Sequence, residues 1–119
     1  MHPTQLSILL VLTLYGSYAY SSSYPQRYTL AWAVKGEQLT YRSCGCADEC
    51  WVADLRTGNR KRLKAKLRCD CSSLYVTYPV NAAEQKRAES CPMNDGPDKM
   101  AEISKEMKAI VAGNQKRKK

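Results

Sequence analysis

The chain has 119 residues, 19 Lys and Arg against 11 Asp and Glu, a formal net charge of +8, and six cysteines. This length suits one small domain, whose core is marginal without covalent help, and we expect no second domain within it. The only histidine is His2, so a domain after the N-terminal segment lacks the imidazole of catalytic triads and histidine-ligated metal sites; we expect no enzyme, no metal and no cofactor.

The N-terminal segment predicts secretion. Residues 6–14 form an apolar run that is shorter than the roughly 20 residues of a membrane-spanning helix. Ser17 and Ala19 then match the small residues that precede a signal-peptidase site. We therefore expect residues 1–19 to be a cleaved signal peptide and the protein to be extracellular, with a buried core helix as the alternative. Residues 20–27 are rich in Ser, Tyr and Pro and are expected to be flexible.

A single domain is expected over residues 28–112, and it begins with strand patterns. Residues 28–34 and 39–42 are rich in strand-forming residues and flank a turn at 35–38, which predicts a β-hairpin. Residues 51–55 predict the next strand. The turn at 56–59 that follows contains Gly58 and Asn59, which accept a positive φ angle.

The most regular segment covers residues 60–71. Its even-numbered positions are charged, and its odd-numbered positions from Leu63 onward are apolar or cysteine, which predicts a long strand with one charged face. Residues 74–78 predict another strand that ends at Pro79. Together these patterns indicate a small antiparallel sheet.

Helical patterns follow the strands. Residues 81–89 predict one or two helical turns, and Asp95 is a candidate cap for a longer helix. The apolar residues of that helix recur on one face: Met100, Ile103, Met107, Ile110 and Val111. Residues 113–119 are expected to be a basic tail. The predicted fold class is a small disulfide-rich α+β protein, an antiparallel β-sheet with a C-terminal amphipathic helix.

All six cysteines follow the predicted signal peptide: Cys44, Cys46, Cys50, Cys69, Cys71 and Cys91. An even number in a secreted chain predicts three disulfides, and the oxidising compartment favours them over a zinc site at the two Cys-x-Cys pairs. Six cysteines allow about 15 pairings, which the sequence does not choose among. The pairing that we expect joins one Cys-x-Cys to the other and leaves Cys50 to bond Cys91.

The charged strand is the candidate binding site. No acidic residue lies between Asp54 and Asp70, so like charges gather where a polyanion would relieve their repulsion. The candidate polyanion-binding residues are Arg60, Lys61, Arg62, Lys64, Lys66 and Arg68. Two alternatives stay open: an ordinary solvated strand face, and processing at the dibasic pairs Lys61–Arg62 and Lys86–Arg87.

A family resemblance adds to this interpretation. The run from Cys50-Trp51-Val52 through Arg68-Cys69-Asp70-Cys71 to Ser90-Cys91 resembles the TAFA family of chemokine-like secreted proteins. The spacings differ, and the late cysteines of that family are absent. The resemblance implies an extracellular ligand that binds receptors and sulfated glycans, and no receptor-contact residue transfers with it.

We therefore predict a secreted basic ligand or effector, cytokine-like or toxin-like. Its expected partners are an extracellular receptor or channel, with sulfated glycosaminoglycan or an anionic membrane surface as further partners and no nucleic acid. The alternatives are an extracellular matrix or mineral-associated structural protein and an antimicrobial, membrane-active protein.

Overall fold

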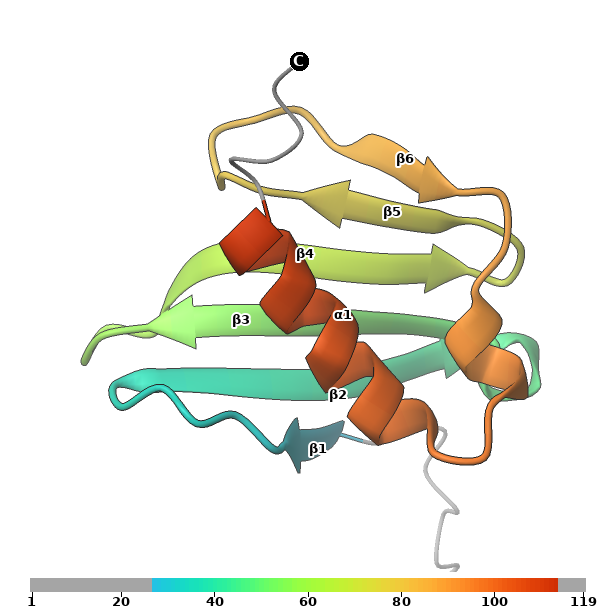
Figure 1. Ribbon diagram of the computed structural model, residues 1–119, viewed down its shortest axis with the longest axis horizontal. Helices are drawn as coiled ribbons and strands as arrows, with labels where there is room; N and C mark the ends of the chain where they lie inside the picture. The colour runs from blue at the N-terminus through green and yellow to red at the C-terminus, as the bar shows by residue number, and fades with distance from the viewer. Residues whose placement is uncertain (1–26, 114–119) are drawn as a thin grey trace, which may run out of the picture.

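Six antiparallel strands form one sheet, and an α-helix crosses one of its faces in the computed structural model (Figure 1). The structure describes residues 27–113. The expected signal peptide, residues 20–26 of the expected flexible segment and residues 114–119 of the expected tail lie outside the described residues. Arg27, the last residue of the expected flexible segment, is instead the first residue of β1.

The strands lie in the sheet in chain order, so each one pairs with its sequence neighbour. The elements are β1 (Arg27–Leu30), β2 (Glu37–Gly45), β3 (Cys50–Thr57), β4 (Arg62–Asp70), β5 (Leu74–Thr77), β6 (Gln85–Ala88), the 3₁₀ helices η1 (Cys46–Asp48) and η2 (Pro92–Asp95), and α1 (Lys99–Gly113). The expected fold class, a small disulfide-rich α+β protein with an antiparallel sheet, is confirmed.

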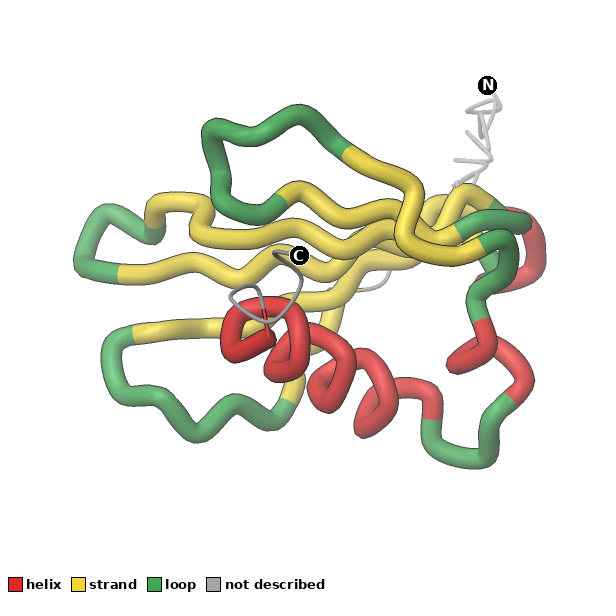
Figure 2. The backbone as a smooth tube through the Cα atoms, turned by 45° about the horizontal axis from the view of Figure 1, so that its top comes forward, coloured by secondary structure: helices red, strands yellow, loops and turns green. Residues whose placement is uncertain are grey.

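The core lies between the sheet and α1, which Figure 2 shows along one side of the strands. Alternate residues of β2 to β5 point toward α1, among them Leu39, Trp51 and Leu67, and all three are fully buried. From the helix, Ile103 and Met107 enter the same cluster. The opposite side of the sheet, which no helix of residues 27–113 covers, is called the open face below.

Three local expectations are wrong. Residues 85–88, expected to be helical, form β6, because pairing with β5 outweighs the high intrinsic helix propensity of Gln, Lys, Arg and Ala. The strand expected at 28–34 ends at Leu30. Asp95 belongs to η2, and the cap of α1 is Asp98, whose Oδ1 accepts the Ala101 N–H at 3.1 Å.

The disulfides are Cys44–Cys50, Cys46–Cys71 and Cys69–Cys91, which leave no free cysteine in the described part of the chain. Only one bond, Cys46–Cys71, joins the two Cys-x-Cys pairs where two were expected, and the expected Cys50–Cys91 bond is also wrong. A register shift between Ser43 and Gly45, which pairs with Cys50, puts Cys44 next to Cys50, with 4.9 Å between their Cα atoms.

A polar cluster fixes the disulfide end of the sheet to α1. The Tyr41 hydroxyl donates to Asp48 Oδ1 at 2.6 Å, and Lys99 Nζ donates to the same hydroxyl at 2.9 Å. Burial, followed by the hydrogen bond to Asp48, raises the pKa of Tyr41. Although burial raises the pKa of Asp48, hydrogen bonds from Tyr41 and Lys99 outweigh it and lower that pKa. These contacts hold β2, η1 and α1 together.

Candidate functional site

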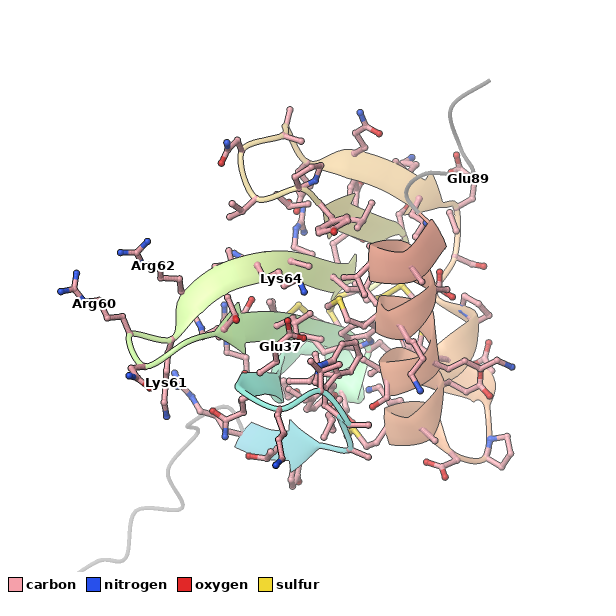
Figure 3. All side chains as sticks on the ribbon, turned by 60° about the vertical axis from the view of Figure 1, so that its left-hand side comes forward. Glu37, Arg60, Lys61, Arg62, Lys64 and Glu89 are labelled. Atoms are coloured by element: carbon pink, nitrogen blue, oxygen red, sulfur yellow. A yellow bond between two sulfur atoms is a disulfide. The ribbon has the colours of Figure 1, made fainter. Side chains whose placement is uncertain are left out.

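The turn between β3 and β4 carries three consecutive basic residues. Arg60, Lys61 and Arg62, called the hairpin tip below, are all exposed, and they project from the end of the sheet in Figure 3. Gly58 and Lys61 both have positive φ angles, and the Lys61 N–H donates to the Gly58 carbonyl at 3.1 Å. This tight turn makes the three cations neighbours in space.

A neighbouring turn adds to the basic character of this end. The Gly58 N–H donates to the Gly36 carbonyl at 3.0 Å, which ties the β3–β4 turn to the turn before β2. Lys35, next to Gly36, is exposed. Within residues 27–113, none of the three tip cations lies within ion-pair distance of a carboxylate. The tip is thus a cluster of uncompensated positive charge.

The structure divides the expected charged face of β4. Leu55 pairs with Ala65, but Arg56 pairs with Leu63, so Lys64 is the extra residue of a bulge. A bulge reverses the side on which the following residues point, so the strand does not carry all its cations on one face. The expectation that Arg60 to Arg68 line a single extended face is therefore wrong.

Lys64 turns toward the α1 side of the sheet and forms an ion pair. Its Nζ lies 2.6 Å from Oε2 of Glu37, and Figure 3 shows the two side chains directed toward each other. Trp32 Nε1 donates to the other oxygen of Glu37 at 2.9 Å. Although burial alone raises the pKa of Glu37, the hydrogen bonds from Lys64 and Trp32 outweigh it, and the pKa falls below its ordinary value of 4.5.

This ion pair makes the free energy of unfolding depend on pH in the acidic range. Unfolding returns the Glu37 pKa to its ordinary value, so the unfolded chain binds more protons and stability falls as the pH drops below about 4.5. We expect E37Q to cost about 1 kcal/mol at pH 7 and progressively less toward pH 3. Urea unfolding at both pH values measures this difference. E102Q, at an exposed helix position, is the control, and a pH-independent cost of E37Q would contradict the prediction.

Arg68 is also compensated, on the open face. Its guanidinium donates two hydrogen bonds of 2.8 Å to the carboxylate of Glu84 and lies 4.4 Å from the ring centroid of Tyr75. The hydrogen bond from Arg68 lowers the pKa of Glu84. Of the six candidate residues, Lys64 and Arg68 therefore form ion pairs within the fold. The three residues of the hairpin tip and Lys66 form no ion pair with residues 27–113.

Other cations join Lys66 on the open face. Successive strand pairings align one row across all six strands, which runs Arg27, Arg42, Val52, Arg68, Tyr75 and Lys86. Paired residues point to the same side of a sheet and lie about 5 Å apart across the strands. The row therefore brings four cations from β1, β2, β4 and β6 onto one surface.

Arg56 connects this row to the hairpin tip. Its Nη1 donates to the Lys61 carbonyl at 3.1 Å, and its Nη2 lies 3.5 Å from Oδ2 of Asp54. No pattern in the sequence pointed to Arg27, Arg42, Arg56 and Lys86 as one site. A signal existed for Arg42, which continues the polar alternation of Gln38 and Thr40, but it becomes a site only when the register aligns it with Arg27 and Arg68.

Residues 27–113 hold no group of three or more His, Cys, Asp or Glu that could bind a metal ion. Over the same residues, no helix has the length and apolar character needed to cross a membrane. Small size and three disulfides are compatible with an extracellular location.

Comparison with known proteins finds no matching family model, no matching curated protein and no matching solved structure.

Proposed function

We propose that this chain is a secreted, non-enzymatic basic ligand that binds acidic glycans through the hairpin tip and the open face. The observation that carries the proposal is the contrast along the basic segment. Lys64 and Arg68 have carboxylate partners, whereas Arg60, Lys61 and Arg62 are exposed and uncompensated. A segment that served only as a solvated strand face has no need to concentrate its unpaired charges at a fixed turn.

The physical basis is electrostatic. Three like charges held together by a tight turn repel one another, and a polyanion relieves this repulsion and releases its own counterions on binding. Heparan-type chains carry sulfates and carboxylates at a high density, and arginine binds both groups in a bidentate geometry. Arg27 and Arg42 of the row form no ion pair with residues 27–113 and extend the positive surface beyond the tip, whereas Arg68 and Lys86 pair with Glu84 and Glu89.

We further propose that glycan binding concentrates the protein near an extracellular receptor or channel. This part rests on the resemblance to TAFA and chemokine-like ligands, and on the absence of histidine after residue 2, which argues against catalysis. Among the alternatives, membrane activity predicts leakage of anionic vesicles, and a structural matrix role predicts self-assembly rather than saturable binding.

Elution from immobilised heparin tests the proposal. The R60Q/R62Q variant removes two tip charges, and K105Q/K108Q removes two exposed charges from α1, so the two variants have the same net charge. We expect R60Q/R62Q to elute at a clearly lower salt concentration than the wild type and K105Q/K108Q to elute close to it. Equal shifts would indicate attraction to net charge alone and would refute a defined site.

A further inference from the structure

The open face contains a cavity of about 340 Å³ over β1, β2 and β3. Its lining combines basic, hydroxyl and acidic groups: Arg27, Thr29, Thr40, Arg42, Asp54 and Arg56. A surface that attracts anions only through net charge gains nothing from a carboxylate in its lining, because Asp54 opposes the binding of any anion. The mixture of groups therefore indicates a more selective ligand.

Two arginines form the anion-binding part of this cavity. Arg27 and Arg42 are direct partners in the pairing of β1 with β2, so two positive side chains stand opposite each other. Like charges in this position destabilise a sheet. Neither guanidinium has a carboxylate within ion-pair distance in the described part of the chain. A sulfate or carboxylate held between them would remove the repulsion and accept hydrogen bonds from both.

Asp54 contributes a hydrogen-bond acceptor to the cavity, whereas the two arginines contribute donors. The residue is 8% exposed, and its Oδ1 accepts no hydrogen bond from residues 27–113. Its nearest cation, Arg56 Nη2, is 3.5 Å from Oδ2, which is longer than a normal charge-assisted hydrogen bond. A buried carboxylate with unused acceptor capacity favours a ligand that brings a donor, such as a hydroxyl group.

We propose that this cavity binds one sulfated sugar unit, with its sulfate between Arg27 and Arg42 and a hydroxyl donated to Asp54. The inference rests on the proposed function and narrows it, because it names sulfated saccharides over anions that lack hydroxyl groups. Arg56 lines the cavity and donates to Lys61, so a glycan chain bound at the hairpin tip continues into the cavity.

Calorimetric titration with two probes tests the proposal: a heparin-derived tetrasaccharide, and tripolyphosphate, which is highly charged but has no sugar hydroxyl. We expect R42Q to weaken tetrasaccharide binding by about tenfold. We expect D54N to strengthen tripolyphosphate binding, because it removes a negative charge, and to weaken tetrasaccharide binding, because a neutral amide is a weaker acceptor than a carboxylate. K105Q, at an exposed position on α1, is the control for the loss of one charge.

The outcomes separate this inference from the proposed function. If R42Q and D54N bind the tetrasaccharide like the wild type while R60Q/R62Q loses heparin affinity, the cavity proposal is overturned and the proposed function stands. If the wild type binds no heparin, both are overturned. An equal gain of affinity for both probes in D54N would also overturn the role of Asp54. Circular dichroism checks that each variant is folded, and R42Q, a substitution of a half-buried surface residue, keeps the test decisive if D54N is unfolded.

Discussion

Replacing Trp51 with alanine is expected to lower the free energy of unfolding by about 3–5 kcal/mol. Trp51 is 0% exposed and packs with its ring centroid 6.0 Å from that of Tyr41. Its Nε1 donates to Asn94 Oδ1 at 2.8 Å, which fixes η2 to the sheet. The substitution leaves both a cavity and an unpaired acceptor. The resulting loss is a large share of the free energy of unfolding of a small domain.

Urea unfolding followed by far-UV circular dichroism measures this loss. W51F keeps most of the apolar volume and loses the hydrogen bond, so we expect it to cost clearly less than W51A. W32A makes the same change at the other tryptophan, which is only half-buried, and is the matched control. A cost of W51A no larger than that of W32A would show that Trp51 does not organise this core.

Removing the Cys69–Cys91 disulfide is expected to cost about 3 kcal/mol or more. The bond closes a separation of 22 residues, compared with 6 for Cys44–Cys50. Loop-closure entropy alone gives about 3 kcal/mol for the first and about 2 kcal/mol for the second. Cys69 and Cys91 are also buried in the core, so their loss removes packing as well.

The comparison of C69A/C91A with C44A/C50A checks this order. Both variants replace two cysteines with alanine, so a difference between their denaturant unfolding midpoints reflects which disulfide was removed. We expect C69A/C91A to have the lower midpoint. The opposite order would mean that the constraint on the β2–β3 turn matters more than the link from β4 to the segment before η2.

The parts of the fold that follow from local patterns were predictable from the sequence. Alternating residues indicated the strands of the central hairpins, and Ile103 and Met107, four residues apart, indicated the buried side of α1. Residues 85–88 were not, since three polar residues and an alanine, none of them a strand former, become a strand only through pairing with β5. The pairing of the cysteines was not, since Cys71 has a positive φ angle beyond the end of β4 and so departs from the alternation of Cys69.

The candidate site was predictable only in part, because its geometry depends on how the strands pair. The sequence indicated the basic segment from Arg60 to Arg68, but not the bulge at Lys64 or the ion pairs that Lys64 and Arg68 form. Glu37 is 27 residues from Lys64 in the sequence, and no local pattern links them. Register decides which of the cations remain free, and register depends on the whole sheet.

The salt dependence of heparin-fragment affinity tests the central claim most directly. A defined set of ionic contacts gives a linear relation between the logarithms of the affinity and of the salt concentration, and each lost contact lowers the slope by about one. We expect R60Q/R62Q to lower the slope by about two, while K105Q/K108Q leaves it unchanged. If both variants alter the slope equally, or neither does, the uncompensated cations of the β3–β4 turn do not form the binding site.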